Sequence, residues 1–128
     1  MDRQNLTLLT DLYELTMMQG YFKHKDRNET VIFDAFYRNN PMDSGYSICA
    51  GLEQVIDYIN NLHFEDDDIA YLRSLGIFGE DFLDYLRDFH FSGDIYAIPE
   101  GSIMFPREPM IKVCLLYTSP SPRDGLLS

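Results

Sequence analysis

The sequence predicts an α+β domain, because stretches typical of helices and stretches typical of strands follow one another in blocks. Residues 6–22 carry apolar side chains at helical spacing, and residues 31–37 are rich in strand-forming residues. Three helical patterns occupy residues 52–89, and three short strand patterns broken by prolines occupy residues 95–113. This order favours α+β over a regular winding of alternating strands and helices.

The first predicted helix covers residues 6–22. Asp11 followed by Glu14 resembles an N-cap with its partner three residues later, although Thr10 is an alternative cap one residue earlier. Gly20 and the polar residues that follow end the helix. The apolar positions recur at three- and four-residue intervals: Leu8, Leu12, Tyr13, Leu15 and Met17.

The middle of the chain predicts two strands and then three helices. Residues 31–37 form the first strand, which Arg38 and the following Asn-Asn-Pro end, and residues 46–50 form a shorter one. Leu52, Val55, Ile56 and Ile59 then fall on one helical face.

The next two helices are marked by apolar residues that follow acidic ones, which suit a helix N-terminus, and three strand patterns come after these helices. The helix markers are Ile69 and Leu72 in the first, and Phe82, Tyr85, Leu86 and Phe89 in the second. The strands are expected at residues 95–98, 102–105 and 110–113.

The charge balance excludes several classes of function. Lys and Arg number 10 against 21 Asp and Glu, a formal net charge of −11, so the chain repels nucleic acid and anionic lipid. Its apolar runs are far shorter than the ~20 residues that span a bilayer, and its first residues lack a signal-peptide pattern. Two cysteines make no disulfide framework, so a cytoplasmic location is expected.

Two residues stand out as candidate ligand contacts. Tyr13, near a helix start, offers a flat ring and a hydroxyl to a ligand, or is simply a core residue. Arg38, at a strand end in an acidic chain, is a candidate anion seat because its guanidinium matches phosphate oxygens, or is a surface residue in a turn.

Other polar residues favour structural interpretations. The run at residues 66–68 is compatible with a cation site, but acidic residues at a helix start favour the helix dipole instead. The three histidines lack metal-ligand spacing and a paired nucleophile: His24, His63 and His90. No phosphate-binding glycine loop and no nucleophile motif is present.

Several motifs in one register resemble the N-terminal signature of the nicotinate phosphoribosyltransferase family. The match runs from about residue 6 to residue 113, and its order makes it more specific than any single motif. The motifs are LTDLYELTM at 9–17, GYF at 20–22, FYRNNP at 36–41, GY at 45–46, AGL at 50–52, YL at 71–72, LG at 75–76, FLDYL at 82–86, GDIYAIPEG at 93–101, FP at 105–106 and EP at 108–109.

The resemblance implies an enzyme that joins nicotinate to phosphoribosyl pyrophosphate, giving nicotinate mononucleotide and pyrophosphate in NAD salvage. It implies ATP hydrolysis as the driving reaction and Mg²⁺ with the phosphates. Tyr13 matches the family tyrosine that stacks on nicotinate across a head-to-tail homodimer interface. Arg38 matches an arginine expected to face substrate phosphate.

The resemblance also implies that much of the enzyme is missing. The chain resembles the N-terminal domain of a type II phosphoribosyltransferase-like protein without its catalytic α/β barrel, so we expect no catalytic residue here. Residues 114–124 (CLLYTSPSPRD) resemble translated sequencing adapter. We therefore expect an incomplete domain at 1–113, a non-native tail at 114–128 and no activity from the chain alone.

Two other functions remain open at the level of sequence. One is a non-enzymatic domain that stands alone and binds a pyridine or a partner protein. The other is a related transferase that uses nicotinamide or quinolinate. The residues TDLYELTM at 10–17 and FYRNNP at 36–41 favour nicotinate.

Overall fold

The computed structural model describes residues 5–24 and 30–116, which form helices and antiparallel strands in the expected α+β class. The elements, in order, are α1 (Leu12–His24), β1 (Thr30–Ala35), the short 3₁₀ helix η1 (Pro41–Asp43), β2 (Ser47–Ile48), α2 (Leu52–Asn60), α3 (Asp66–Ser74), α4 (Glu80–Arg87), β3 (Gly93–Ala97), β4 (Ile103–Met104) and β5 (Ile111–Leu116).

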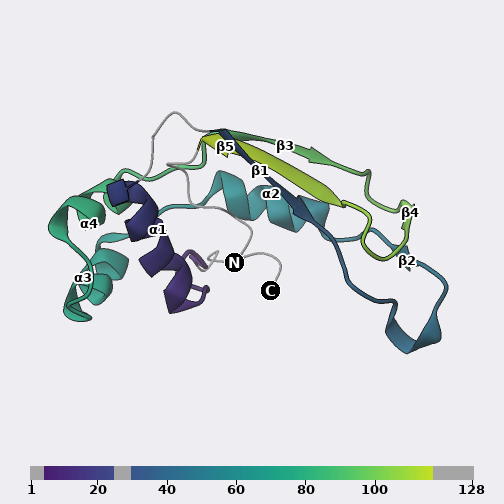
Figure 1. Cartoon of the computed structure of the whole chain (residues 1–128), viewed down its shortest axis with the longest axis horizontal. Helices are drawn as coiled ribbons and strands as arrows, with labels where there is room; N and C mark the ends of the chain where they lie inside the picture. The colour runs from purple at the N-terminus through teal and green to yellow at the C-terminus, as the bar shows by residue number, and fades with distance from the viewer. Residues whose placement is uncertain (1–4, 25–29, 117–128) are drawn as a thin grey trace.

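Helices α1, α3 and α4 form a cluster at one end of the molecule (Figure 1). Its centre is made by the apolar face of α4, where Phe82, Leu83 and Leu86 are fully buried. Leu15 and Met18 of α1 pack into the same core. This helical cluster holds α1 through one face only, which leaves its other face open to solvent.

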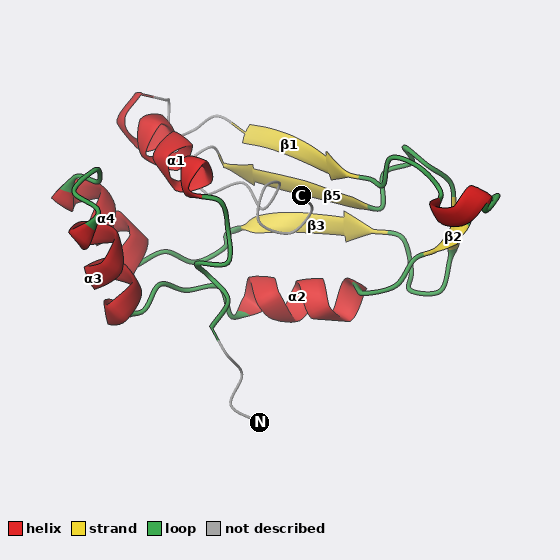
Figure 2. Ribbon diagram, turned by 90° about the horizontal axis from the view of Figure 1, so that it is seen from below, coloured by secondary structure: helices red, strands yellow, loops and turns green. Residues whose placement is uncertain are grey.

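Strands β1, β5 and β3 form an antiparallel sheet in that order, with β5 in the centre. Helix α2 runs beside this sheet (Figure 2), and its Leu52 and Val55 pack on the sheet core. Because side chains alternate along a strand, every second residue of β5 enters that core: Ile111, Val113 and Leu115. Beyond the sheet, β2 and β4 pair as a small second sheet.

A carboxylate from a distant loop caps the start of α2. Gly51 precedes the helix with a left-handed φ of 107°, which favours glycine and leaves no side chain to act as a cap. The Glu100 carboxylate accepts hydrogen bonds from the Gly51 and Leu52 amides at 2.7 and 3.0 Å. The loop between β3 and β4 is therefore tied to α2.

The first helix begins later than its apolar spacing predicts. Residues 6–9 form a turn, in which the Leu9 amide donates to the Leu6 carbonyl oxygen at 2.9 Å. Helix α1 starts at Leu12, which places Asp11 at the position expected for the N-cap. Gly20 lies inside the helix, which continues to His24. Leu8 packs on the helical cluster from this turn, so it extends the periodic pattern without being helical, whereas Leu6 and Leu9 are exposed.

The last strand also differs from expectation, because it continues past Val113. Cys114, Leu115 and Leu116 extend β5 and pair with β1, and the first two of them also pair with β3. Leu115 is only 2% exposed. The structured domain therefore includes three residues that we assigned to the tail, since they continue the alternation of the strand. The adapter origin of the remaining tail, residues 117–128, is a prediction that lies outside the described residues.

Replacing Leu115 with Ala should lower the free energy of unfolding by about 2–5 kcal/mol, the usual cost of truncating a buried leucine. Lys112→Ala, on an exposed position of the same strand, is the matched control and should stay within about 0.5 kcal/mol. Urea unfolding of the purified chain measures both. Equal stability of the two variants would contradict the central position of β5.

Candidate functional site

Tyr13 lies in the first turn of α1 on the side that the helical cluster leaves open. Its side chain is 52% exposed, whereas Leu15 and Met18 of the same helix are each 7% exposed. Two residues along a helix is roughly half a turn, so a buried Leu15 turns Tyr13 toward solvent. The interpretation of Tyr13 as a core residue is therefore wrong.

Apolar side chains surround Tyr13 in the sequence and are also exposed. Each member of this group, which we call the α1 patch, is at least 43% exposed. The α1 patch consists of Leu9, Leu12, Tyr13 and Met17. A group of apolar side chains presented to solvent is typical of a surface that contacts a ligand or another protein.

Helix α1 is fixed to the α3–α4 connection by one side-chain amide. The Gln19 carboxamide donates to the Ile77 carbonyl oxygen at 3.1 Å and accepts from the Gly79 amide at 2.7 Å. A Cβ at Gly79 would lie 2.6 Å from an Asp81 carboxylate oxygen, so the close approach favours glycine. Together with the buried face of α1, this clamp gives Tyr13 a rigid support.

The start of α1 also lies within electrostatic reach of α2. Burial, and then the negative charge of Glu14, raise the pKa of the Tyr58 hydroxyl above its ordinary value. Tyr58 therefore stays neutral beside the first turn of α1.

Arg38 follows β1 and is exposed. The preceding residue is firmly held: the Tyr37 hydroxyl lies 2.9 Å from Asn40 Oδ1 and 3.0 Å from the Met104 carbonyl oxygen, and the Tyr37 carbonyl accepts from the Arg107 amide at 2.8 Å. The backbone at Arg38 is thus anchored while its guanidinium is free to meet a ligand from solvent.

The fold does not bring these two candidates together within one chain. Helix α1 belongs to the helical cluster, whereas the segment after β1 leads to the opposite end, where β2 and β4 lie (Figures 1 and 2).

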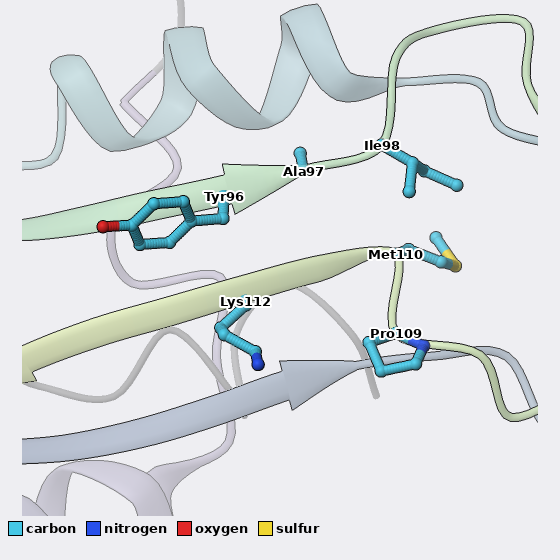
Figure 3. A pocket seen from close by; sticks show the side chains of 6 residues that line it. All are labelled: Tyr96, Ala97, Ile98, Pro109, Met110 and Lys112. Carbon is cyan, nitrogen blue, oxygen red and sulfur yellow. The ribbon is translucent and has the colours of Figure 1, made fainter.

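The outer face of the sheet carries a shallow, open hollow of about 440 Å³ (Figure 3). It contains neither Tyr13 nor Arg38, and it offers one cation, Lys112, beside the Tyr96 ring. The remaining lining is Ala97, Ile98, Pro109 and Met110.

The acidic run at residues 66–68 occupies the first turn of α3, where Asp68 forms a capping box with Glu65. Asp68 Oδ2 accepts from the Glu65 amide at 2.8 Å. Within residues 5–24 and 30–116, no three His, Cys, Asp or Glu side chains gather as a metal site requires. The same described part of the chain holds no helix with the length and hydropathy needed to cross a membrane.

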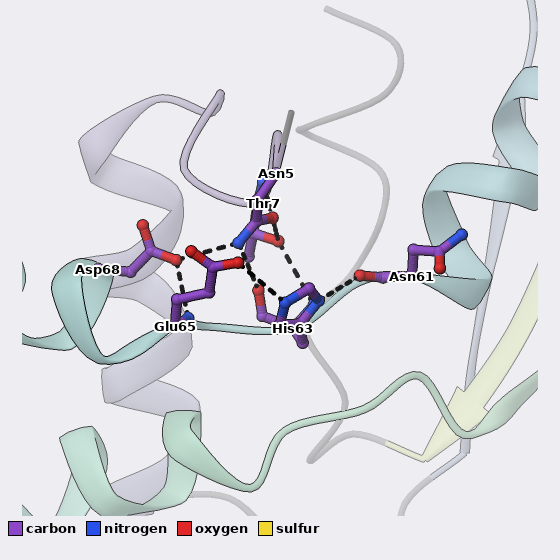
Figure 4. A network of polar contacts seen from close by, with 6 residues as sticks. All are labelled: Asn5, Thr7, Asn61, His63, Glu65 and Asp68. Carbon is purple, nitrogen blue, oxygen red and sulfur yellow. Dashed lines mark hydrogen bonds and ion pairs between the residues drawn. The ribbon is translucent and has the colours of Figure 1, made fainter. Parts of the chain in front are cut away.

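His63 lies in a polar network that joins the N-terminal segment to the start of α3 (Figure 4). Its Nδ1 is 2.6 Å from the Asn61 carbonyl oxygen, and its Nε2 is 3.4 Å from Glu65 Oε1. The contact with Asn61, followed by that with Glu65, raises the pKa of the His63 ring. The network also contains Asn5 and Thr7, which no sequence pattern singles out because their partners are more than fifty residues away.

Comparison with known proteins places the chain in a family. Residues 8–116 match the family model of the nicotinate phosphoribosyltransferase (NAPRTase) N-terminal domain. The chain belongs to this family. The resemblance seen in the motifs is thereby confirmed, and the match includes Cys114 to Leu116 of strand β5.

Named relatives agree with this assignment. The chain is 40% identical over 106 residues to a nicotinate phosphoribosyltransferase of Mycobacterium tuberculosis, covering 83% of this chain and 23% of the relative. It is 38% identical over 109 residues to the Bacillus subtilis protein of that name, covering 85% of this chain and 22% of the relative.

The fold agrees as well. The crystal structure of human nicotinic acid phosphoribosyltransferase superposes with a TM-score of 0.76 at 29% identity, over 86% of this chain and 23% of the human chain. The chain thus spans less than a quarter of the length of these relatives, and the catalytic domain of the family is absent from it.

Proposed function

We propose that this chain is the N-terminal domain of an enzyme that joins nicotinate to phosphoribosyl pyrophosphate, with nicotinate mononucleotide and pyrophosphate as products. The match of residues 8–116 to the family carries this proposal. Formation of the mononucleotide would serve NAD salvage. The relatives are named for nicotinate, which favours that substrate over nicotinamide or quinolinate.

Tyr13 is the residue that we assign to the nicotinate ring. Its ring is presented to solvent by a helix whose other face is buried, so it offers a flat surface with little freedom to move. Aromatic rings in offset or edge contact gain about 0.5–1.5 kcal/mol beyond the area they bury. Arg38 is assigned to substrate phosphate, because a guanidinium pairs with phosphate oxygens through two parallel hydrogen bonds.

The site would be completed by a second copy of the enzyme, arranged head to tail. Two observations support this arrangement. Helix α1, which carries Tyr13, lies at one end of the molecule, whereas β1, which Arg38 follows, runs toward the other end (Figure 2); a head-to-tail arrangement places unlike ends of two copies together. The exposed α1 patch also supplies apolar surface of the kind that protein interfaces bury.

ATP and Mg²⁺, which the family resemblance implies, would be held outside this chain. The carboxylates at residues 66–68 do not fit a metal site, because Asp68 is already engaged by the Glu65 amide and by Asn5. The role of this domain is therefore to bind and orient nicotinate, and the transfer of the phosphoribosyl group would take place on the missing part of the enzyme.

The 128-residue chain alone should form no nicotinate mononucleotide when supplied with nicotinate, phosphoribosyl pyrophosphate, ATP and Mg²⁺. The physical reason is that the domain offers ring and phosphate contacts without catalytic groups. Product formation is measured by chromatography against a tag-only control. Turnover above that control would show that the domain is catalytically complete.

The role of Tyr13 is testable in a chimera in which residues 5–116 replace the matching part of the Bacillus subtilis relative. Tyr13→Ala should raise KM for nicotinate up to about tenfold, since a loss near 1.4 kcal/mol corresponds to a factor of ten. Tyr13→Phe should have a smaller effect, because it keeps the ring. Steady-state kinetics measure both.

Tyr71→Ala, which removes a similarly exposed tyrosine ring from α3, outside the α1 patch, is the matched control. It should leave KM for nicotinate within twofold of the parent chimera. A Tyr13→Ala chimera that is folded and kinetically unchanged would return Tyr13 to a purely structural role.

A further inference from the structure

The segment before α1 is tied to the start of α3 by one side chain. Asn5 Nδ2 donates to the His63 carbonyl oxygen and to Asp68 Oδ2, each at 3.2 Å (Figure 4). Asp68 is itself fixed, because the same Oδ2 accepts from the Glu65 amide. Asn5 thus reaches across about sixty residues of sequence to a rigid helix turn.

Thr7 completes this connection from a buried position. It is 5% exposed, and its hydroxyl donates to Asn5 Oδ1 at 2.6 Å while accepting from the His63 amide at 3.4 Å. The Thr7 amide donates to the same Asn5 oxygen at 3.1 Å. We call Asn5, Thr7, the His63 backbone and Asp68 the N-terminal latch. Breaking any member leaves a polar group in it without its partner, which is costly for the buried Thr7.

The latch lies directly before the exposed stretch that carries Tyr13. Leu8 follows Thr7 and packs on the helical cluster, and Leu15 enters the same cluster from α1. The intervening residues 9–14 are therefore held at both ends. The latch and Leu8 hold the first of these ends, so the latch limits how far the first turn of α1 can shift or fray.

We propose that the N-terminal latch is a positioning device for the nicotinate contact, and that Asn5 and Asp68 act on the substrate through Tyr13 without touching it. This inference rests on the proposed function, since it presumes that Tyr13 meets the nicotinate ring. A ring held in place gives up less conformational entropy when it binds, so the latch contributes to affinity.

A second negative charge placed beside Asp68 should break the hydrogen bonds of the latch. Asn5→Asp in the chimera replaces the donor by a second carboxylate where Asn5 Nδ2 now lies 3.2 Å from Asp68 Oδ2, and like charges at that distance repel. KM for nicotinate should rise severalfold, by no more than Tyr13→Ala raises it, while KM for phosphoribosyl pyrophosphate stays within twofold.

A second substitution should remove the repulsion without rebuilding the latch. Asp68→Asn in the Asn5→Asp background takes away one of the two facing charges, so KM for nicotinate should fall part of the way toward the parent value. Recovery stays partial, because Asp68 Oδ2 also accepts from the Glu65 amide and the Asn5 donor to the His63 carbonyl is still missing. His63→Gln is the matched control: the latch uses only the backbone atoms of His63, so this variant should leave KM for nicotinate unchanged.

A purely structural role is separated from positioning by combining variants. In the Tyr13→Ala background, Asn5→Asp should raise KM for nicotinate no further, because the ring that it positions is gone. Additive effects of the two substitutions would overturn the proposal, as would a rise in both Michaelis constants. Where Asn5→Asp yields no folded chimera, Asn5→Ala opens the latch without repulsion and should shift KM in the same direction.

The two proposals fail in different ways. If Tyr13→Ala leaves KM for nicotinate unchanged, the assignment of Tyr13 fails and the latch has nothing to position. If Tyr13→Ala raises KM but neither Asn5 variant does, the assignment of Tyr13 stands and the latch proposal is overturned.

Discussion

The antiparallel pairing of β5 with β1 on one side and β3 on the other holds the sheet half of this domain together. Residues 30–35 and 93–97 are not neighbours in the sheet, and each reaches the other only through β5. The side chains of β5 then form the floor on which α2 packs. Without this strand, two edges would be left open and the apolar face of α2 would lose its partner. The position of the loop that carries Arg38 follows from the same pairing, because β1 leads into it.

Much of this arrangement could be predicted from the sequence, and the exceptions have physical causes. The apolar face of α2 and that of α4 were visible because their periodicity is strong and continuous. The strand end was set too early at Val113, although Ile111, Val113 and Leu115 show the alternation of a half-buried strand. The alternation predicts a strand that continues to Leu115, whereas the resemblance of residues 114–124 to adapter sequence predicts that the domain ends at Val113. The helix starts later than its apolar spacing predicts, because Leu8 packs on the same core from a turn before Leu12.

For the candidate site, the sequence predicts which residues are involved but not how they are exposed. Tyr13 and Arg38 were found from their residue types and from motif resemblance, but spacing could not show that Tyr13 is exposed. That exposure depends on which face of α1 meets α4, a tertiary property. The N-terminal latch left no signal at all, since Asn5 and Asp68 are ordinary polar residues until the fold brings them together. Gln19 was missed for the same reason.

Under the proposed function, the domain supports a small binding surface. Both candidate side chains stand outside the two cores. In a chain with a net charge of −11, binding of an anion must depend on local cations such as Arg38. Exposed apolar side chains such as those of the α1 patch favour aggregation of an isolated chain. Their exposure is consistent with a surface that another copy of the enzyme covers.

The most direct test is a crystal structure of the chimera, with residues 5–116 of this chain, bound to nicotinate mononucleotide. The account predicts that the pyridine ring faces Tyr13 of one protomer with ring centroids about 4.5–7 Å apart, while the ribose and phosphate lie on the partner. A bound pyridine ring with no Tyr13 of either protomer beside it would contradict the account.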